Sequence, residues 1–275
     1  MIATLVIFLR EGVEASMIIA ILLAYLNRSG QRRYFRDVFA GVGVALVLAG
    51  AGGVIAYETI RSYAGSRTQT IFETGTYLLA AVVLTYMTFW MRSHARGLSS
   101  DLRARADAAM SGGARAGLAL LAFQAVGREG LETVVFTLAI AFSTTQRSAM
   151  IGAVIGLAIA LAIAFGTYRL GHRLNLARFF TIVGALLMVF GAGLLVDAVQ
   201  NLQVLGWLPW ASHPLWHTGT ILNEDTAVGD LAHSFFGYAQ SPTGLQVGVY
   251  VLYLAVALIA FFNVRRRIFG ARAAS

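Results

Sequence analysis

Two short strings of charged residues interrupt segments of the chain that are otherwise apolar. Residues 10–14 read Arg-Glu-Gly-Val-Glu, and residues 128–132 read Arg-Glu-Gly-Leu-Glu. A charged side chain at the centre of a bilayer costs roughly 2.5–3.5 kcal/mol on insertion scales, so residues of this kind usually serve a function. The chemistry of the chain therefore depends on what these carboxylates and guanidinium groups do inside apolar segments.

Each string predicts a compact group of charges on one face of a helix. Residues three and four positions apart are neighbours there, so the two glutamates share a face and the arginine can pair with the second glutamate. The carboxylates are those of Glu11, Glu14, Glu129 and Glu132, and the supporting arginines are Arg10 and Arg128. The central glycines, Gly12 and Gly130, lack side-chain bulk, which favours a close approach of the two helices that brings the carboxylates together.

Four carboxylates and two guanidinium groups leave two negative charges in excess if all are ionised. Repulsion between the carboxylates favours their protonated forms when no cation is bound. A multivalent cation relieves that repulsion and releases protons, and a set of oxygen ligands selects hard metal ions. The chain has no Cys, which excludes thiolate-bound zinc, Cu(I) and iron–sulfur centres. The strings therefore predict a hard-metal site, with purely structural ion pairs or a metal-free proton relay as alternatives.

The overall composition is that of an all-α polytopic membrane protein. Of the 275 residues, 58% are hydrophobic and only 12% are charged, whereas soluble domains carry about 25% charged residues. All basic residues are arginines, and they give a net charge of +8. They cluster between apolar runs, as the positive-inside rule describes, so nucleic acid is not an expected partner and membrane lipid is.

Apolar runs of about 20 residues predict seven transmembrane helices. They cover residues 2–26, 38–57, 71–91, 116–142, 149–168, 179–200 and 246–264. The first run lacks the basic flank of a signal peptide, and charged residues interrupt it, so it is expected to be retained as a helix. The chain is thus expected to form a single membrane domain over residues 1–275.

The arginines between the runs predict the orientation of the chain. Sixteen of them lie in the first, third and fifth connections and in the C-terminal tail, against three in the remaining connections. Arginine-rich segments stay in the cytoplasm, so the C-terminus is expected inside and the N-terminus outside. The segment 201–245 is then an extracytoplasmic loop.

This orientation exposes an internal repeat. The first and fourth helices run in opposite directions, each carries one charged string near its middle, and each is followed by a helix rich in small residues such as Gly152 and Gly156. Small residues spaced in this way allow close helix contact. We therefore expect inverted repeats over residues 1–91 and 116–200, with 246–264 as an extra helix, an arrangement typical of secondary transporters.

The sequence resembles a known family, the oxidase-dependent iron permeases, which include the fungal high-affinity iron permease and the bacterial permease of the Efe iron-uptake system. An Arg-Glu-x-x-Glu motif occurs once in the first helix and once in the fourth helix of that family, as it does here at residues 10–14 and 128–132. The resemblance extends over essentially the whole chain. It includes Phe72-Glu73, Tyr86-Met87, Trp90-Met91, Gly193-Leu194-Leu195, Gln200-Asn201-Leu202-Gln203, Gly237-Tyr238 and Pro242.

The resemblance implies uptake of iron, as a transported substrate, across the bacterial cytoplasmic (inner) membrane, with the four motif glutamates carrying the ion. It implies a permease rather than an enzyme, with no permanently bound cofactor, and an extracytoplasmic iron oxidase or iron carrier as partner. Proton-coupled transport of another divalent ion such as Mn²⁺ stays open. A di-iron oxidase is the alternative outside transport, but such sites also use Glu-x-x-His, and no histidine stands near either string. The redox state of the ion and the oligomeric state stay open.

Two further acids could line an external vestibule. Glu73 lies just inside the outer end of the third predicted helix, and Asp197 lies at a comparable depth in the sixth. Carboxylates at such positions would draw cations toward the middle of the membrane. Ordinary interfacial acids are the alternative explanation.

Overall fold

The structure is a computed structural model that describes residues 1–94, 97–111, 113–170, 176–224 and 226–270. Within these ranges the regular structure is almost entirely helical, with a single isolated β-bridge between Pro214 and Thr243. Short parts of the third and fifth predicted connections, and of the C-terminal tail, lie outside the described residues. The expectation of an all-α protein is confirmed.

Seven long helices contain the seven apolar runs. They are α1 (Ile2–Arg28), α2 (Phe35–Arg61), α3 (Arg67–His94), α5 (Ala114–Ser143), α6 (Gln146–Leu170), α7 (Leu176–Val204) and α9 (Gly244–Gly270). Most extend a few residues past the predicted ends, because a helix can continue through the polar residues that flank an apolar run. Two short helices, α4 (Leu98–Ser111) and α8 (Ala227–Phe236), occupy segments that the sequence predicted as loops.

Five segments of these helices are long and apolar enough to cross a membrane. They are Arg32–Arg61, Arg67–Met91, Gln146–Gly166, Arg178–Val204 and Gly244–Phe261. Helices α1 and α5 are as long as the others, but the charged strings interrupt their apolar runs. The chain is a multi-pass helical protein by this measure, and five spans follow from length and composition alone.

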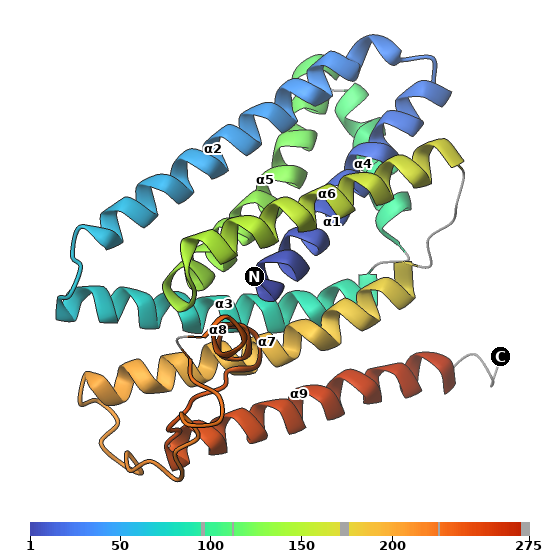
Figure 1. Cartoon of the computed structure of the whole chain (residues 1–275). Coiled ribbons are helices and arrows are strands. Elements are labelled where there is room, and N and C mark those ends of the chain that lie inside the picture. Colours follow the sequence, from blue (N-terminus) through green and yellow to red (C-terminus); the bar gives the residue numbers. More distant parts are fainter. Residues whose placement is uncertain (95–96, 112, 171–175, 225, 271–275) are drawn as a thin grey trace.

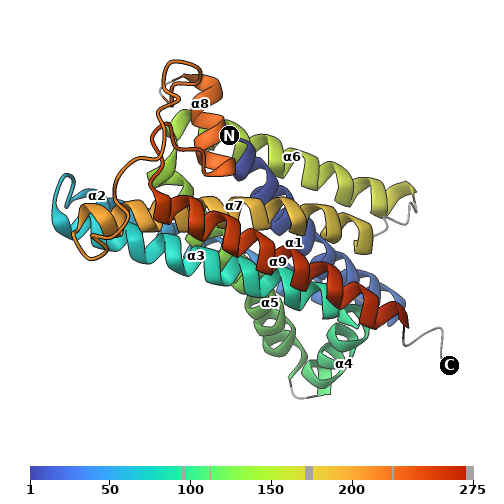
Figure 2. The same cartoon turned by 90° about the horizontal axis from the view of Figure 1, so that it is seen from below.

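The long helices pack in crossed pairs rather than in chain order. Helix α1 packs mainly on α6, α2 packs mainly on α5, and α3 packs on α7, which also holds α9. Figures 1 and 2 both show α3, α7 and α9 side by side, while α1, α2, α5 and α6 form a second group that crosses them. The first helix of each predicted repeat is thus paired with the second helix of the other repeat.

Glycines make the crossed pairs close. A Cβ atom on Gly152 would lie 2.2 Å from the carbonyl oxygen of Met1, and one on Gly156 would lie 2.4 Å from that of Leu5. In the other pair, a Cβ atom on Gly41 would lie 2.1 Å from the carbonyl oxygen of Ala119. Backbone therefore meets backbone in both pairs, which confirms the close contact predicted from the small residues.

Two apolar clusters lie on either side of the first charged string. One cluster joins α1, α3, α5 and α7 around residues such as Ile7, Leu84 and Phe190. The other joins α1, α2, α4 and α5 around residues such as Leu22 and Leu118. The string at residues 10–14 falls between them along α1, so a polar layer separates two apolar ones.

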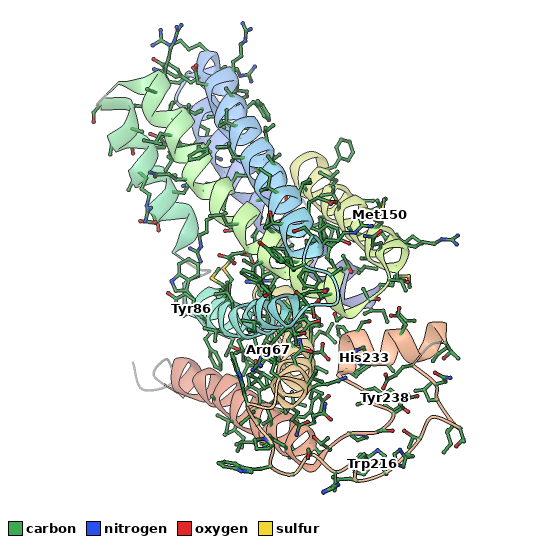
Figure 3. The ribbon with its side chains drawn as sticks, turned by 90° about the vertical axis from the view of Figure 1, so that its left-hand side faces the viewer. Arg67, Tyr86, Met150, Trp216, His233 and Tyr238 are labelled. Atoms are coloured by element: carbon green, nitrogen blue, oxygen red, sulfur yellow. The ribbon has the colours of Figure 1, made fainter. Side chains whose placement is uncertain are left out.

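The segment between α7 and α9 is held by its own hydrogen bonds. Leu215 N donates to the carbonyl oxygen of Pro242 over 2.9 Å, and Thr218 N donates to that of Gln240 over 2.8 Å. The hydroxyl of Thr226 caps the first turn of α8, and Gly237, with φ of 66°, ends that helix. Figure 3 shows this segment, with Trp216 and Tyr238, gathered beside the ends of α7 and α9.

Candidate metal-binding site

The first string forms a closed charge group in the middle of α1. The Nε atom of Arg10 lies 3.0 Å from Oε1 of Glu14, and its Nη1 atom lies 3.2 Å from Oε1 of Glu11. The three residues are 2%, 3% and 2% exposed, which is unusual for charged side chains. The pairing of Arg10 with Glu14 that helical spacing predicted is confirmed.

The second string repeats the pairing in α5 but not the surroundings. The Nε atom of Arg128 lies 3.0 Å from Oε1 of Glu132. Its Nη2 atom donates to the sulfur of Met87 over 2.7 Å, and its guanidinium lies 4.5 Å from the ring centroid of Trp90. The Arg128 side chain is 41% exposed, against 3% for Arg10.

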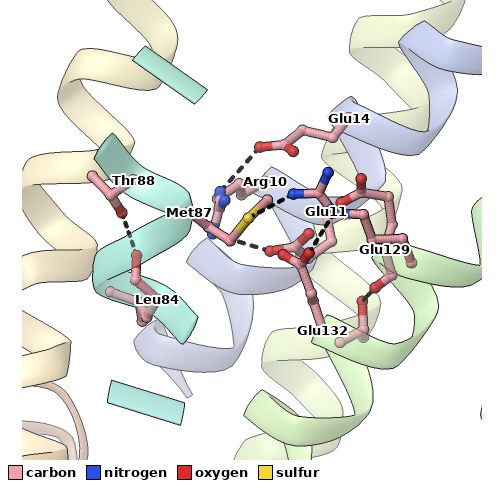
Figure 4. A network of polar contacts seen from close by, with 10 residues as sticks. Arg10, Glu11, Glu14, Leu84, Met87, Thr88, Glu129 and Glu132 are labelled. Atoms are coloured by element: carbon pink, nitrogen blue, oxygen red, sulfur yellow. Dashed lines mark hydrogen bonds and ion pairs between the residues drawn. The ribbon is translucent and has the colours of Figure 1, made fainter. Parts of the chain in front are cut away.

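Carboxylates of both strings converge between α1 and α5. Glu11, Glu14 and Glu129 each offer an oxygen atom, and these atoms all lie within 4.8 Å of one another. Glu132 stands outside this group of three but is also buried, and Figure 4 shows it beside Glu11 and Glu129. The structure thus brings three of the four predicted carboxylates within reach of one cation and places the fourth next to them.

Several of these buried oxygens accept no hydrogen bond from a described residue. They are both oxygens of Glu11, one of Glu129 and one of Glu132. Oε1 of Glu11 still lies in the ion pair with Arg10. Oε2 of Glu11 and these oxygens of Glu129 and Glu132 are therefore those without a close partner among the described residues. A buried charged oxygen without a partner is costly. Converging carboxylate oxygens with unused lone pairs are suited to a hard cation, which would satisfy them together.

The motif glycines have a different role from the predicted one. A Cβ atom on Gly12 would lie 2.7 Å from Cβ of Ala160 in α6, and one on Gly130 would lie 2.8 Å from Cβ of Ala49 in α2. Neither glycine faces the other motif helix, so the prediction that they let α1 and α5 approach each other was wrong. Because glycine follows the first glutamate, it lies on another face of the helix, and that face packs in the crossed pair.

The two vestibule candidates do not join the carboxylate group in the described structure. Oε1 of Glu73 accepts a hydrogen bond of 2.7 Å from Gln69 Nε2 in the same helix. Asp197 is 8% exposed, and its Oδ1 atom lies 3.7 Å from Nε2 of His233 on α8. Asp197 therefore links α7 to α8, whose His233 is labelled in Figure 3.

Sequence reasoning missed the residues around Arg128. The sequence offers Met87 and Trp90 as part of the family resemblance, and Trp90 also as an interface-belt or packing residue, yet both contact the guanidinium of Arg128 from α3. Their spacing of three residues, which places them on one helix face, was the available signal. The spacing of Met87 and Trp90 does not, however, indicate which charged residue they contact.

A multi-pass helix bundle with converging carboxylates at its centre has the features of a membrane transporter of ions. Residues 1–270 match the family described as the iron permease FTR1 family. The chain therefore belongs to this family. Because permeases move their substrate without converting it, the expectation of a transporter rather than an enzyme is confirmed.

The relatives that it resembles are named ferrous iron permease EfeU. The protein from Yersinia pestis is 34% identical over 258 residues, which cover 93% of this chain and 91% of the relative. The protein from Escherichia coli O6:K15:H31 is 33% identical over 257 residues, covering 93% of each chain, as is the protein from Shigella sonnei. No solved structure matches the chain.

Proposed function

We propose that the chain carries iron ions across the bacterial cytoplasmic membrane into the cell by way of Glu11, Glu14, Glu129 and Glu132. The observation that carries this proposal is the convergence of buried carboxylates from both strings, with oxygen atoms that accept no hydrogen bond from the described part of the chain. Such oxygens favour a hard cation over a purely structural pairing of arginine with glutamate. Iron is the cargo because the family is one of iron permeases.

The charge of the site suits Fe²⁺. The four carboxylates and two guanidinium groups, if ionised, leave two negative charges, which one divalent ion balances. The relatives are named ferrous iron permeases, which agrees with this count. Arg10 and Arg128 hold Glu14 and Glu132 in their rotamers and limit carboxylate repulsion while the site is empty. Protons that the empty site holds leave as the metal enters.

The chain is further proposed to cross the membrane seven times, with its N-terminus outside and its C-terminus inside. Helices α1 and α5 add two spans to the five apolar ones, and burial of their charged strings in the bundle supports this count. The crossed pairs α1–α6 and α2–α5 support inverted repeats over residues 1–91 and 116–200. In each pair the first helix of one repeat packs on the second helix of the other, so the two pairs are equivalent under the symmetry of the repeats. Residues 201–245 then lie outside, and 246–264 form the extra helix.

Iron is proposed to enter on the side that holds α8. Glu73 and Asp197 lie toward the ends of α3 and α7 on that side, where carboxylates would raise the local concentration of cations. An extracytoplasmic iron oxidase or iron-carrier protein would deliver the ion there. The contact of Asp197 with His233 places α8 next to this entrance, so a protein that delivers iron at α8 would release the ion beside Asp197.

The test is iron uptake into proteoliposomes that contain only this protein. Wild type is compared with Glu14→Gln and Glu132→Gln, which keep the side-chain size and remove the charge. Both variants are expected to lose at least about 90% of uptake, since each removes a charged carboxylate from the proposed path. Fe²⁺ and chelated Fe³⁺ are supplied in turn, with Mn²⁺ as competitor.

Two results would contradict the proposal. Wild-type uptake by both variants would show that Glu14 and Glu132 do not carry the ion. Stronger uptake of Mn²⁺ than of iron would make the protein a carrier of another divalent ion. A Glu58→Gln variant is the matched control, because Glu58 lies in an exposed ion pair at the end of α2.

A further inference from the structure

A cavity of about 190 Å³ lies beside the carboxylate group and is lined by residues of α1, α3, α4 and α5. Its charged and amide-bearing lining residues are Glu14, Asp101, Arg105, Gln124, Arg128 and Glu129. Glutamates of both strings therefore border the same cavity as two charged residues of α4. The cavity extends from the proposed ion site to a short helix that the seven proposed spans do not include.

Helix α4 forms a fixed wall of this cavity. Leu102 and Ala106, four residues apart, are buried in the apolar cluster shared with α1 and α5. The hydroxyl of Tyr25 in α1 donates a hydrogen bond to the carboxylate of Asp107. Figures 2 and 3 show α4 beside α5, on the side of the bundle away from α8.

The two acids of α4 have different surroundings. Asp101 lines the cavity and pairs with Arg105 at 3.0 Å, and both side chains are more than half exposed. Asp107 is bound to Tyr25 and is not among the residues that line the cavity. The helix therefore presents one carboxylate to the cavity and one to α1.

We propose that this cavity is the inner part of the ion path, and that Asp101 receives the ion after it leaves Glu14 and Glu129. This inference rests on the proposed function and on the placement of α4, within the arginine-rich connection 92–115, in the cytoplasm. The ion passes from a buried group of carboxylates to a single carboxylate that is open to water. When no ion is present, Arg105 forms an ion pair with Asp101.

Release needs such an intermediate ligand for a physical reason. A path conducts only if its binding sites hold an ion strongly enough for entry and weakly enough for exit, which several sites in series achieve. One exposed carboxylate binds a divalent ion weakly. An exposed ion pair contributes little free energy, so an arriving cation can displace Arg105 from Asp101.

A purely structural role for Asp101 makes a different prediction. Asp101 lies in the first turn of α4, where a negative charge stabilises a helix. In that case, Asp101→Asn would lower the thermal stability of the protein without a specific effect on transport. Asp107→Asn is the matched control, because it makes the same chemical change on the same helix outside the cavity lining.

The experiment measures initial rates of Fe²⁺ uptake into proteoliposomes for wild type, Asp101→Asn, Asp107→Asn and Glu14→Gln. Asp101→Asn is expected to lower the rate about five- to tenfold while leaving the equilibrium binding of Fe²⁺ to the detergent-solubilised protein within about twofold of wild type. Asp107→Asn is expected to stay within about twofold of wild type in both assays.

The outcomes separate this inference from the proposed function. A wild-type rate for Asp101→Asn, or equal losses in both aspartate variants, would overturn the role of Asp101. Wild-type uptake by Glu14→Gln would instead contradict the proposed function. Because the chain has no cysteine, a single Arg105→Cys variant also reports the side of the cavity. An impermeant maleimide should label it in inside-out vesicles, and labelling only in right-side-out vesicles would make the cavity an entrance.

Discussion

The two Arg-Glu-Gly-x-Glu strings share their internal ion pair but not their surroundings. Arg10 is closed off from solvent and lies close to both glutamates of its own string. Arg128 pairs with only one glutamate and turns its remaining donors toward Met87 and Trp90 beside the cavity. The same residues thus form a sealed charge group in α1 and an open one in α5.

This difference follows from the neighbours of each helix. Helix α1 packs on α6, α5, α4 and α7, which enclose Arg10, whereas Arg128 lies at a cavity that is also lined by Glu14 and by residues of α3 and α4. Helical spacing therefore fixes the pairing of arginine with glutamate, and the bundle fixes how much water reaches it. The Arg128 side chain is therefore much more open to water than that of Arg10.

The largest predicted difference concerns the two arginines. Arg10→Gln leaves two buried carboxylates without their counter-ion, and breaking a buried pair costs about 3–5 kcal/mol. Arg128→Gln breaks a pair in which the arginine is half exposed, so a loss on the order of 1 kcal/mol is expected. The measurement is the thermal unfolding midpoint in detergent, read from the monodisperse fraction after heating. Equal midpoints for the two variants would remove the contrast between a sealed and an open string.

A smaller effect is predicted where the two halves of the molecule are alike. Gly156→Ala and Gly41→Ala each force a methyl group against a backbone carbonyl, in the α1–α6 and α2–α5 pairs respectively. Each should cost about 1–3 kcal/mol, as overpacking usually does, and the two costs should be similar. The measurement is again the unfolding midpoint.

Matched controls exist on the same helices. Gly166 in α6 and Gly50 in α2 have no atom within 4 Å of a built Cβ atom. Their replacement by alanine should be neutral or slightly stabilising, because alanine favours the helix. A Gly156→Ala variant as stable as Gly166→Ala would show that the crossed pairs are looser than the structure has them.

The smallest predicted effect belongs to the open string alone. Trp90→Leu removes a cation–π contact with Arg128 that contributes about 0.5–1 kcal/mol. Met87→Leu removes the sulfur that accepts from the same guanidinium. Because both act on Arg128, the unfolding midpoint of the double variant should shift by less than the sum of the single shifts. Strict additivity would mean that Arg128 is not held by both residues together.

The sequence is sufficient to predict the long helices and the internal geometry of each string. Apolar runs located all seven long helices, and helical spacing predicted the pairing of Arg10 with Glu14 and of Arg128 with Glu132. These features depend on residues that are close along the chain. They are therefore readable without knowledge of the packing.

Features that depend on distant segments were not predictable in the same way. Small residues indicate close contact but not the partner, so Gly12 and Gly130 were assigned to the wrong neighbours. The sequence predicts a loop in place of α4 because this segment is too polar to cross a membrane, although Leu102 and Ala106 have the spacing of a buried helix face. The surroundings of Arg128 come from residues about 40 positions earlier in the chain.

The crossed pairing of helices has a consequence for how the protein is made. Helix α1 is synthesised first, yet its main partner, α6, follows more than 100 residues later. Until α5 and α6 reach the bilayer, the charges of Arg10, Glu11 and Glu14 have no bundle to enclose them. We expect α1 to reach its final packing only after α6 has been made, so that neither repeat folds to its final structure without the other. The carboxylates of α1 and α5 can then come together only after α5 has been made, when more than half of the chain has been completed, through Ser143.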